Sequence, residues 1–552
     1  MTPSLIAFVG ASAALVLALG ASLRRPASRA LTHPATLGAV VLFAVSMIVR
    51  AGSVEPTLVH ADVVAPELVD CVLQAPRACA TRGASYGPYG FLVLGALTRP
   101  FGDDLNAVFR AMALVGALNV ALLAVLAGRL SGSPYGALFA VAVAGTNPVF
   151  MRVAGSEDMH NVGLLLALVA LIVMDVHAMT RRAAPLAAAV LALGLLVHTR
   201  QTFYVVVPCA FVLGLARGGR GLLGSSGFLA AGLVVVVVLV SRIAANAASG
   251  GLVQQMAGVF LEPVLLPTIL RHHALLDVGR FGALPALTVA AVIWACRDGR
   301  MARAAALAFA LNFVVTYPCG MPSPGVELAQ RLSVVAFGML LVAMAGAAAV
   351  EGRVPERWRV VVGLGAAGVL TALPPFFPGW RVLAGRTPIH REYLAVASAA
   401  AALPNTFTLV KAPTAEATVH GYARYAGLLE RTGRHVRVVP ARELAAAPRP
   451  WIFLEDVECW TYSFRELTGA GDDRPTGPMA EVRWDKVLFG RQVSPIRPPA
   501  GMRPECRRIE RDGTPIGPRG VISGPEDDPP FLFYAGSEVP IQFYELRAGA
   551  AG

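Results

Sequence analysis

The stretch "NAVFRAMALVGALNVALLAVLAG", residues 106–128, decides the class of this protein. It contains one charged side chain, Arg110, near its start. A helix needs about 20 apolar residues to cross a hydrocarbon core roughly 30 Å thick, so this stretch predicts a transmembrane helix. Charged residues make up 15% of the 552-residue chain and hydrophobic residues 55%. Because soluble domains carry roughly 25% charged residues, the composition excludes an ordinary soluble protein.

Runs of similar length recur up to residue 376 and then stop. They predict a membrane all-α fold, a polytopic bundle of about twelve transmembrane helices. The predicted spans are 4–22, 35–50, 106–128, 135–151, 161–177, 184–198, 203–216, 225–245, 281–296, 303–318, 332–350 and 358–376. The stretch "YGFLVLGAL", residues 89–97, is too short to span and predicts an interfacial or re-entrant helix.

Arginine predicts the orientation, because positive charge in short loops stays on the cytoplasmic side. Every second loop between the predicted helices contains this positive charge: "RRPASR", Arg129, "RR", "RGGR", "RDGRMAR" and "EGRVPERWR". The remaining loops are longer and mix acidic with basic residues: 51–105, 152–160, 246–280 and 319–331. We therefore expect these loops, both termini and everything after residue 377 to face outward. In the first run positive charge follows the apolar residues, the reverse of a secretory signal, so we expect a helix there.

A formal charge of +12 does not indicate nucleic-acid binding here. Lys411 and Lys486 are the only lysines, and much of the arginine lies at predicted helix ends. There it sets topology and meets anionic lipid headgroups. No basic patch with interleaved aromatic residues, as single-stranded nucleic acid requires, is present in the sequence.

Residues 1–376 are predicted to form the transmembrane domain, with an outer loop at 51–105, and residues 377–552 a small extracytoplasmic α/β domain. In the second part "TFTLV", "HVRVV" and "WIFLEDV" have the composition of strands. The interval 466–530 is rich in Gly, Pro and Asp and predicts irregular loops.

Five of the seven cysteines fall on the expected oxidising side, where two disulfides are plausible, Cys71–Cys79 and Cys459–Cys506, with Cys319 left over. Cys209 and Cys296 lie in predicted helices as small hydrophobic residues. A zinc site on these cysteines is the weaker reading, because the sequence has no C-x-x-C pair.

Carboxylates gather in the outer loops. The first loop, "VHADVVAPELVDC" at residues 59–71, contains Asp62, Glu67 and Asp70, and Glu157 and Asp158 lie at the next outward helix end. One interpretation is that they only keep the loops soluble. The other is that two acidic sites at one membrane level converge as a catalytic base and its partner.

Three stretches resemble the polytopic GT-C glycosyltransferases, which take sugars from polyprenyl-phosphate donors and include protein mannosyltransferases and the aminoarabinose transferase of lipid A. The first, "YGPYGFLVLGALTRPFGDDLNAVFRAMALVGALNVALLAVLAGRLSG" at 86–132, is similar to the family's proline-bearing interfacial helix, Gly-Asp turn and Arg-containing helix. "SEDMHNVGLLLALVAL" and "LALGLLVHTRQTFYVVVP" are similar to the helix openings that follow, in the same order.

The resemblance implies an inverting glycosyltransferase of the bacterial inner membrane, with Asp62 as base and Asp158, beside Glu157, positioning the acceptor or sharing the proton. The carrier phosphate would be bound by arginine, whose fork engages two oxygens at once. The candidates are Arg110, Arg200 and Arg331, each at or near an outward helix end; headgroup snorkelling is the alternative for each.

The chain departs from the family's motifs at three places. Asp62 is followed by Val63 instead of Glu, and Arg331 by Leu332 instead of Tyr. "YGPY", residues 86–89, stands where the family has a His-Pro-Pro or similar tripeptide, and Tyr89 is the candidate there for substrate binding.

Metal binding stays open. His272, beside His273, is a candidate for metal or phosphate contact, although adjacent helical residues point about 100° apart and rarely bind one ion. Some relatives are metal-dependent, so a divalent ion held by Asp62 and Asp158 is a second option. Two other classes compete with the enzyme: a secondary transporter, which would have charges near helix centres, and a membrane-anchored interaction protein of the envelope.

Overall fold

The computed structural model describes a helical unit and a separate sheet unit. The described residues of the helical unit are 33–53, 88–102, 105–147, 149–151, 159–247, 283–316 and 332–374. Those of the sheet unit are 402–411, 426, 429–430, 433–440, 446–453, 505–508 and 544–547. The predicted boundary at 376/377 falls between these ranges and stays a prediction.

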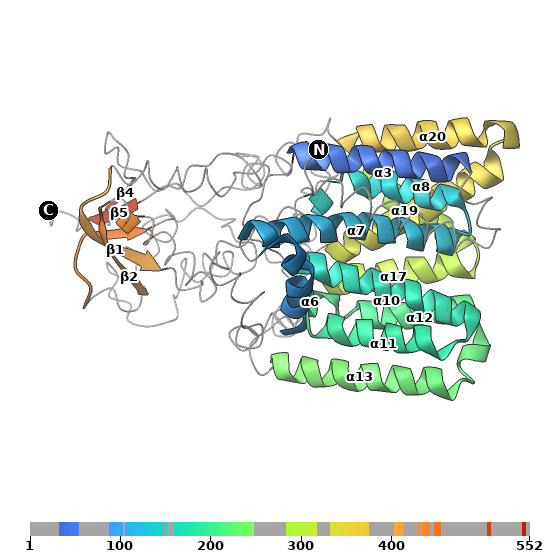
Figure 1. The fold of residues 1–552 in the computed structure, drawn as a ribbon, viewed down its shortest axis with the longest axis horizontal. Helices are drawn as coiled ribbons and strands as arrows, with labels where there is room; N and C mark the ends of the chain where they lie inside the picture. Colours follow the sequence, from blue (N-terminus) through green and yellow to red (C-terminus); the bar gives the residue numbers. More distant parts are fainter. Residues whose placement is uncertain are drawn as a thin grey trace, which may run out of the picture. The chain divides into compact units, whose positions relative to one another are not determined.

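The helical unit consists of long helices packed side by side, with the short α6 across their ends (Figure 1). Its helices are α3 (Pro34–Ser53), α6 (Pro88–Thr98), α7 (Leu105–Ser131), α8 (Pro134–Gly145), α10 (His160–Thr180), α11 (Ala183–Val197), α12 (Val206–Gly218), α13 (Ser226–Ala247), α16 (Leu284–Arg297), α17 (Arg300–Thr316), α19 (Leu332–Arg353) and α20 (Glu356–Ala372). Three single 3-10 turns lie between them: η2 (Arg99–Phe101), η3 (Gln201–Phe203) and η4 (Arg220–Leu222).

Apart from 135–151, each predicted span that falls on described residues corresponds to one helix, and residues 89–97 lie within α6. The span at 4–22 lies outside the described residues, so the count of about twelve stays a prediction. In the described part, four helices are long and apolar enough to cross a membrane: Ala107–Ser131, His160–Thr180, Ser226–Ala244 and Leu332–Arg353. Shorter apolar helices pack beside them.

The predicted span 135–151 was wrong as a single helix, because α8 ends at Gly145. The side-chain oxygen of Asn147 accepts hydrogen bonds from the backbone N–H groups of Val149 (2.9 Å) and Phe150 (3.3 Å). An asparagine that satisfies the first N–H groups of a following turn is a helix start signal, so the chain begins a new turn there.

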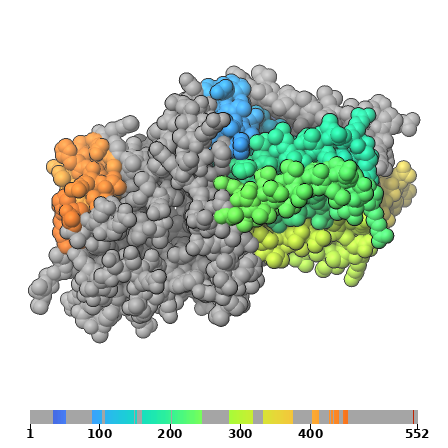
Figure 2. Space-filling view, turned by 90° about the horizontal axis from the view of Figure 1, so that it is seen from below, coloured from blue at the N-terminus to red at the C-terminus, as the bar shows by residue number. Residues whose placement is uncertain are grey.

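Central and peripheral helices differ in burial. The central windows of α7, α10 and α19 are 78%, 67% and 72% buried, whereas only 11% of the α13 window is buried. Figure 2 shows α13, in green, across the near face of the helical unit. Its exposed leucine and valine side chains are the expected surface of a helix that faces lipid.

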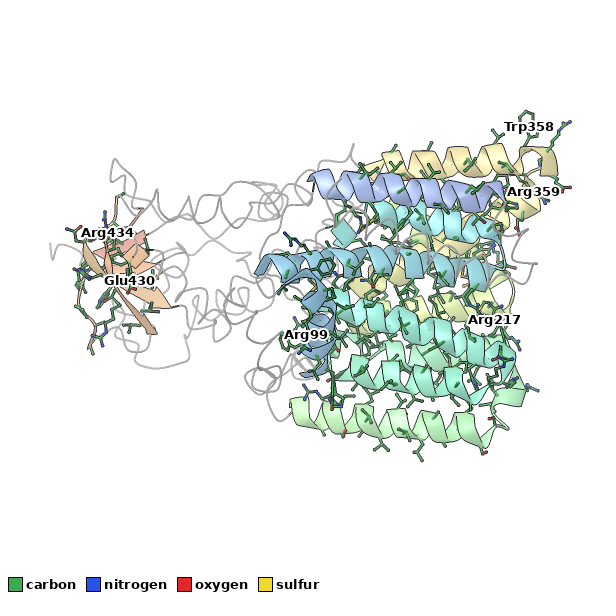
Figure 3. All side chains as sticks on the ribbon, in the orientation of Figure 1. Arg99, Arg217, Trp358, Arg359, Glu430 and Arg434 are labelled. Carbon is green, nitrogen blue, oxygen red and sulfur yellow. The ribbon has the colours of Figure 1, made fainter. Side chains whose placement is uncertain are left out.

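Arginine is concentrated at one end of the helical unit, which we call the arginine-rich end. In Figure 3 it carries Arg217 and Arg359, and Arg99 lies beside α6 at the other end, which we call the α6 end. The position of each arginine along its helix assigns it to one end or the other. The described arginines of the arginine-rich end are Arg129, Arg181, Arg182, Arg217, Arg220, Arg297, Arg300, Arg303, Arg353, Arg357 and Arg359. Those of the α6 end are Arg50, Arg99, Arg110, Arg200 and Arg242.

This asymmetry predicts that the arginine-rich end is cytoplasmic and the α6 end extracytoplasmic. A reporter fused after residue 299, in the turn between α16 and α17, should be active only as a cytoplasmic reporter. A reporter fused after residue 460 should be active only as a periplasmic one. Paired alkaline phosphatase and green fluorescent protein fusions measure this, and a cytoplasmic reading at 460 would refute the outward placement of the C-terminal part.

The described residues of the sheet unit form five strands in the order β2-β1-β3-β5-β4. They are β1 (Thr406–Lys411), β2 (His435–Pro440), β3 (Trp451–Phe453), β4 (Glu505–Arg508) and β5 (Tyr544–Arg547). β1 pairs in parallel with β2 and β3, and β5 pairs antiparallel with β3 and β4. The first three strands were predicted.

β4 is a short strand within 466–530, where mostly irregular loops were predicted, and neither β4 nor β5 was predicted as a strand. Both strands have four residues and contain charged side chains, so neither shows the apolar alternation that marks a half-buried strand. β4 lies at the edge of the sheet, where charged residues are common.

Candidate functional site

The described residues contain three of the predicted site residues: Tyr89, Arg110 and Arg200. The others lie outside them and stay predictions, as do the disulfides; they are Asp62, Glu157, Asp158, His272, Arg331, Cys71, Cys79 and Cys459. Cys506 belongs to β4, but its side chain is not described. Cys209 is a buried free thiol, as expected for a small core residue, whereas Cys296 is exposed.

The helix α6 carries Tyr89, one of the predicted site residues. It contacts α7, α10 and α11. Its buried face contains Phe91, Leu94 and Thr98. The Thr98 hydroxyl donates its single hydrogen to the Leu94 carbonyl at 2.7 Å. Tyr89 is 40% exposed and meets His198 edge to face, with ring centroids 5.3 Å apart. The predicted interfacial helix is therefore docked on the bundle, with the Tyr89 side chain partly exposed.

Gly90 allows α6 to approach the residues after α11. A Cβ at this position would lie 2.7 Å from Thr199 Cγ2 and 3.4 Å from Thr199 Oγ1. The Thr199 hydroxyl donates to the Leu195 carbonyl at 2.7 Å, so the side chain cannot rotate away without losing that bond.

We therefore expect Gly90→Ala to separate α6 from the end of α11. Overpacking of this kind costs about 1–3 kcal/mol, and the measured thermal midpoint should fall accordingly. Adding Thr199→Ser removes the clashing methyl group but keeps the hydroxyl, so the double variant should recover the midpoint. A Gly90→Ala protein as stable as wild type would show that α6 does not dock here.

Arg200 lies in the segment that turns the chain from α11 into η3, and its side chain is only 6% exposed. Phe203, in η3, is buried and faces His160 at the first turn of α10, with ring centroids 6.1 Å apart. A Cβ on Gly163 would lie 2.7 Å from the Phe203 ring, so glycine is needed for this contact. In the sequence Glu157 and Asp158 precede Met159, the residue before α10; both lie outside the described residues.

His198 completes the described part of the site. His198 directly follows α11 and meets the Tyr89 ring. A neutral imidazole can offer one donor and one acceptor to a sugar hydroxyl. Arg110 lies on the exposed surface of α7.

A buried pair of asparagines fixes the start of α10 against α7, and the sequence reading missed it. Asn119 Nδ2 donates to Asn161 Oδ1 (2.7 Å) and to the Asn161 carbonyl (2.9 Å). Asn161 Nδ2 donates to the Met112 carbonyl at 2.9 Å. The signal that could have found the pair is Asn119 itself, an amide inside an apolar span, since such groups bond between membrane helices.

Residues 85–244 match the family model of dolichyl-phosphate-mannose-protein mannosyltransferase. This match confirms the predicted resemblance to GT-C transferases over less than a third of the chain, from just before α6 to α13. It includes all the site residues described above. No curated protein matches the sequence.

Similar solved structures include those of two proteins. The oligosaccharyltransferase of Archaeoglobus fulgidus, crystallised with Zn and sulfate, has 13% identity and a TM-score of 0.48, over 90% of this chain and 76% of its own. ArnT of Cupriavidus metallidurans in the apo state has 16% identity and a TM-score of 0.42, over 80% of this chain and 96% of its own. ArnT bound to undecaprenyl phosphate has 15% identity and a TM-score of 0.37, over 78% of this chain and 95% of its own. At these scores the structures do not assign a function.

A second polar cluster lies at the arginine-rich end. Asp175 of α10 accepts from Arg129 Nε of α7 (2.7 Å) and from Arg217 Nε of α12 (2.6 Å). Arg217 also donates to the Arg129 carbonyl at 2.5 Å. The Asp175 side chain is 4% exposed, and its two oxygens are used by the two guanidinium groups. The cluster joins three helices and has the features of a structural tie.

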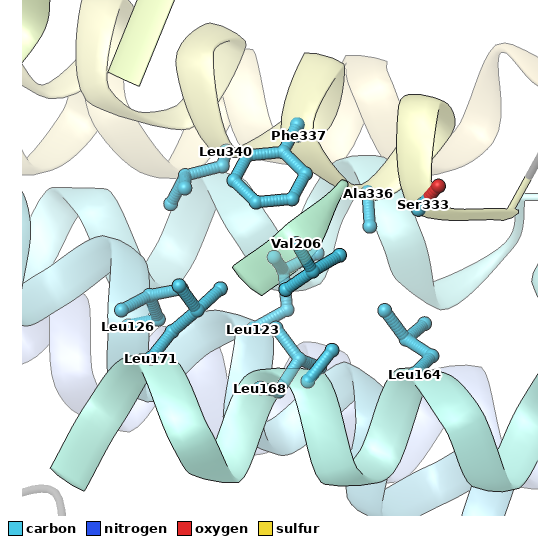
Figure 4. A pocket seen from close by; sticks show the side chains of 11 residues that line it. Leu123, Leu126, Leu164, Leu168, Leu171, Val206, Ser333, Ala336, Phe337 and Leu340 are labelled. Carbon is cyan, nitrogen blue, oxygen red and sulfur yellow. The ribbon is translucent and has the colours of Figure 1, made fainter. Parts of the chain in front are cut away.

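The cavity in Figure 4 lies between α7, α10, α12 and α19 and is almost wholly apolar. Its lining includes Leu126, Leu168, Val206 and Phe337, with Ser333 as the polar member. None of its lining residues is charged, so the lining offers no acid or base. Among the described residues no group of three or more His, Cys, Asp or Glu could hold a metal ion, and the divalent ion stays a prediction.

Proposed function

We propose that the chain is an integral-membrane glycosyltransferase that moves a sugar from a polyprenyl-phosphate donor to an extracytoplasmic acceptor. The observation that carries this proposal is the family match across 85–244. Within this range Tyr89 meets His198 edge to face, and the buried Arg200 follows His198 by two residues in the chain. The matched family is named for a lipid-phosphate sugar donor, and a lipid phosphate lies at the depth of helix ends.

The reaction needs a base near the acceptor and a cation near the departing phosphate. In our proposal the acceptor hydroxyl or amine attacks the anomeric carbon while the bond from that carbon to the phosphate oxygen breaks, with inversion. Asp62 takes the acceptor proton, and Asp158, with Glu157 beside it, positions the acceptor. The polyprenyl phosphate leaves with the bond's electron pair.

Arginine is suited to that leaving phosphate, since its planar fork binds two oxygens. Of the three predicted ligands, Arg200 has the burial expected of such a group, whereas Arg110 is exposed and suits headgroup contact. Arg331 and His272 remain candidates. We place the enzyme in the bacterial inner membrane, with the sheet unit on the outer side.

The described charges argue against the secondary transporter. Such a protein carries ionisable groups near helix centres. In the described part of the bundle the carboxylates are Asp175, Asp298, Glu351 and Glu356, all at the arginine-rich end, and Asp175 is held by two arginines.

The test is transfer of labelled sugar from a polyprenyl-phosphate donor in membranes that contain the full chain. We expect label in an acceptor fraction that membranes without the chain do not produce. The same sugar supplied as a nucleotide diphosphate should not be used when synthesis of the lipid donor is blocked. Transfer from the nucleotide sugar alone would contradict the proposed donor class, and transfer from neither donor across a panel of lipid-linked sugars would contradict the enzyme.

A further inference from the structure

Arg50, near the end of α3, is a buried charge that the proposed chemistry does not yet use. Its side chain is 6% exposed. Arg50 Nε donates to the Gly145 carbonyl at 2.8 Å and Nη2 donates to the Ala144 carbonyl at 2.9 Å. The guanidinium thus caps the C-terminal end of α8, which a positive charge favours.

One nitrogen of this guanidinium remains without a partner. Arg50 Nη1 is buried and makes no hydrogen bond among the described residues. The hydroxyl of Ser46, one turn earlier on α3 and fully buried, is likewise unpartnered in the described part. A Cβ on Gly145 would lie 2.3 Å from Ser46 Oγ, so Ser46 and Arg50 converge on the same glycine.

The described surroundings of Arg50 supply no negative charge. All described carboxylates of the helical unit lie at the arginine-rich end, whereas Arg50 lies at the α6 end with four further described arginines. Leaving a buried cationic donor without an acceptor is costly, more so than for a neutral group. The donor geometry of a guanidinium matches an oxyanion, either a carboxylate or a phosphate.

We propose that Arg50, with Ser46 beside it, forms an oxyanion site at the α6 end, and that its occupant is the phosphate of the lipid-linked donor. This inference rests on the proposed function. A lipid phosphate lies at the depth of the helix ends, where Arg50 is placed one turn from the end of α3. Arg50 lies outside the matched range 85–244, so the family match does not assign it.

The experiment measures binding to the purified full chain in nanodiscs with three probes: undecaprenyl phosphate, undecaprenol and inorganic phosphate. We expect wild type to bind undecaprenyl phosphate and not the alcohol. Loss of a charge-assisted hydrogen bond should make the Kd of Arg50→Gln at least about tenfold weaker. Arg50→Lys, which keeps the charge but loses the fork, should lie between them. Arg99→Gln, an exposed arginine at the same end, should bind as wild type does.

Arg50→Gln also removes the cap on α8, so a second measurement uses the wild-type chain. A diazirine placed beside the phosphate of the lipid probe should cross-link to the peptide that contains Ser46 and Arg50. Equal Kd values for wild type and Arg50→Gln, or cross-links that avoid this peptide, would overturn the inference and leave the glycosyltransferase in place. Equally tight Arg50-dependent binding of inorganic phosphate would overturn the lipid as occupant. Failure of wild type to bind the lipid or to transfer sugar would overturn both proposals.

Discussion

Asp62→Asn is expected to lower the rate of sugar transfer by about 10²–10⁴-fold, because the variant keeps the shape of the side chain but cannot accept the acceptor's proton. A carboxylate that only keeps the loop soluble would cost nothing measurable when changed to the amide. The assay is transfer of labelled sugar from a polyprenyl-phosphate donor in membranes that contain each variant at matched levels. We expect Asp158→Asn to have the next largest effect.

Glu67 is the matched control, since it lies in the same loop and has no assigned role. Glu67→Gln should transfer sugar at the wild-type rate. If Glu67→Gln abolishes transfer while Asp62→Asn does not, the wrong carboxylate has been assigned. If neither variant changes the rate, the loop is not part of the catalytic machinery.

Asp175→Asn is expected to cost about 3–5 kcal/mol of stability, the largest stability effect in the described part of the chain. Asp175 is the shared partner of Arg129 and Arg217, and its removal leaves two guanidinium groups with little exposure and no carboxylate. The three residues come from α10, α7 and α12, so the loss should loosen packing among these helices. Thermal unfolding of the purified protein in one detergent measures the effect.

The control for Asp175 is Glu356→Gln, because Glu356 is exposed in the first turn of α20. Its loss should cost about 0.3–1 kcal/mol through the helix dipole alone. Equal shifts in the unfolding midpoint for the two variants would show that the cluster at the arginine-rich end is not a tie between helices. A normal rate of sugar transfer per folded Asp175→Asn molecule is expected, since the cluster lies at the end opposite α6.

Several parts of this fold could be predicted from local pattern. The length of each apolar run determines a helix because backbone groups in a bilayer must be bonded within their own segment. The residues of α7, α10 and α19 therefore identified these helices to within a few positions, and strands β1 and β2 followed from short β-branched runs. The end of α8 was missed because it depends on one side chain, Asn147, and not on hydropathy.

The amino-acid sequence by itself determined the membrane class, the helical spans, the arginine asymmetry and the resemblance that led to Asp62 and Arg200. Only the tertiary structure decided which polar groups are buried and which have partners. Arg50 and Asp175 both resemble ordinary charges near helix ends, yet one is a buried cation without a described counter-charge and the other is an anion shared by two cations. The reason is physical, because burial and hydrogen-bond partners come from residues on other helices. Arg50 and its partner Gly145 are 95 positions apart in the sequence, and a local sequence pattern does not reveal contacts over such a separation.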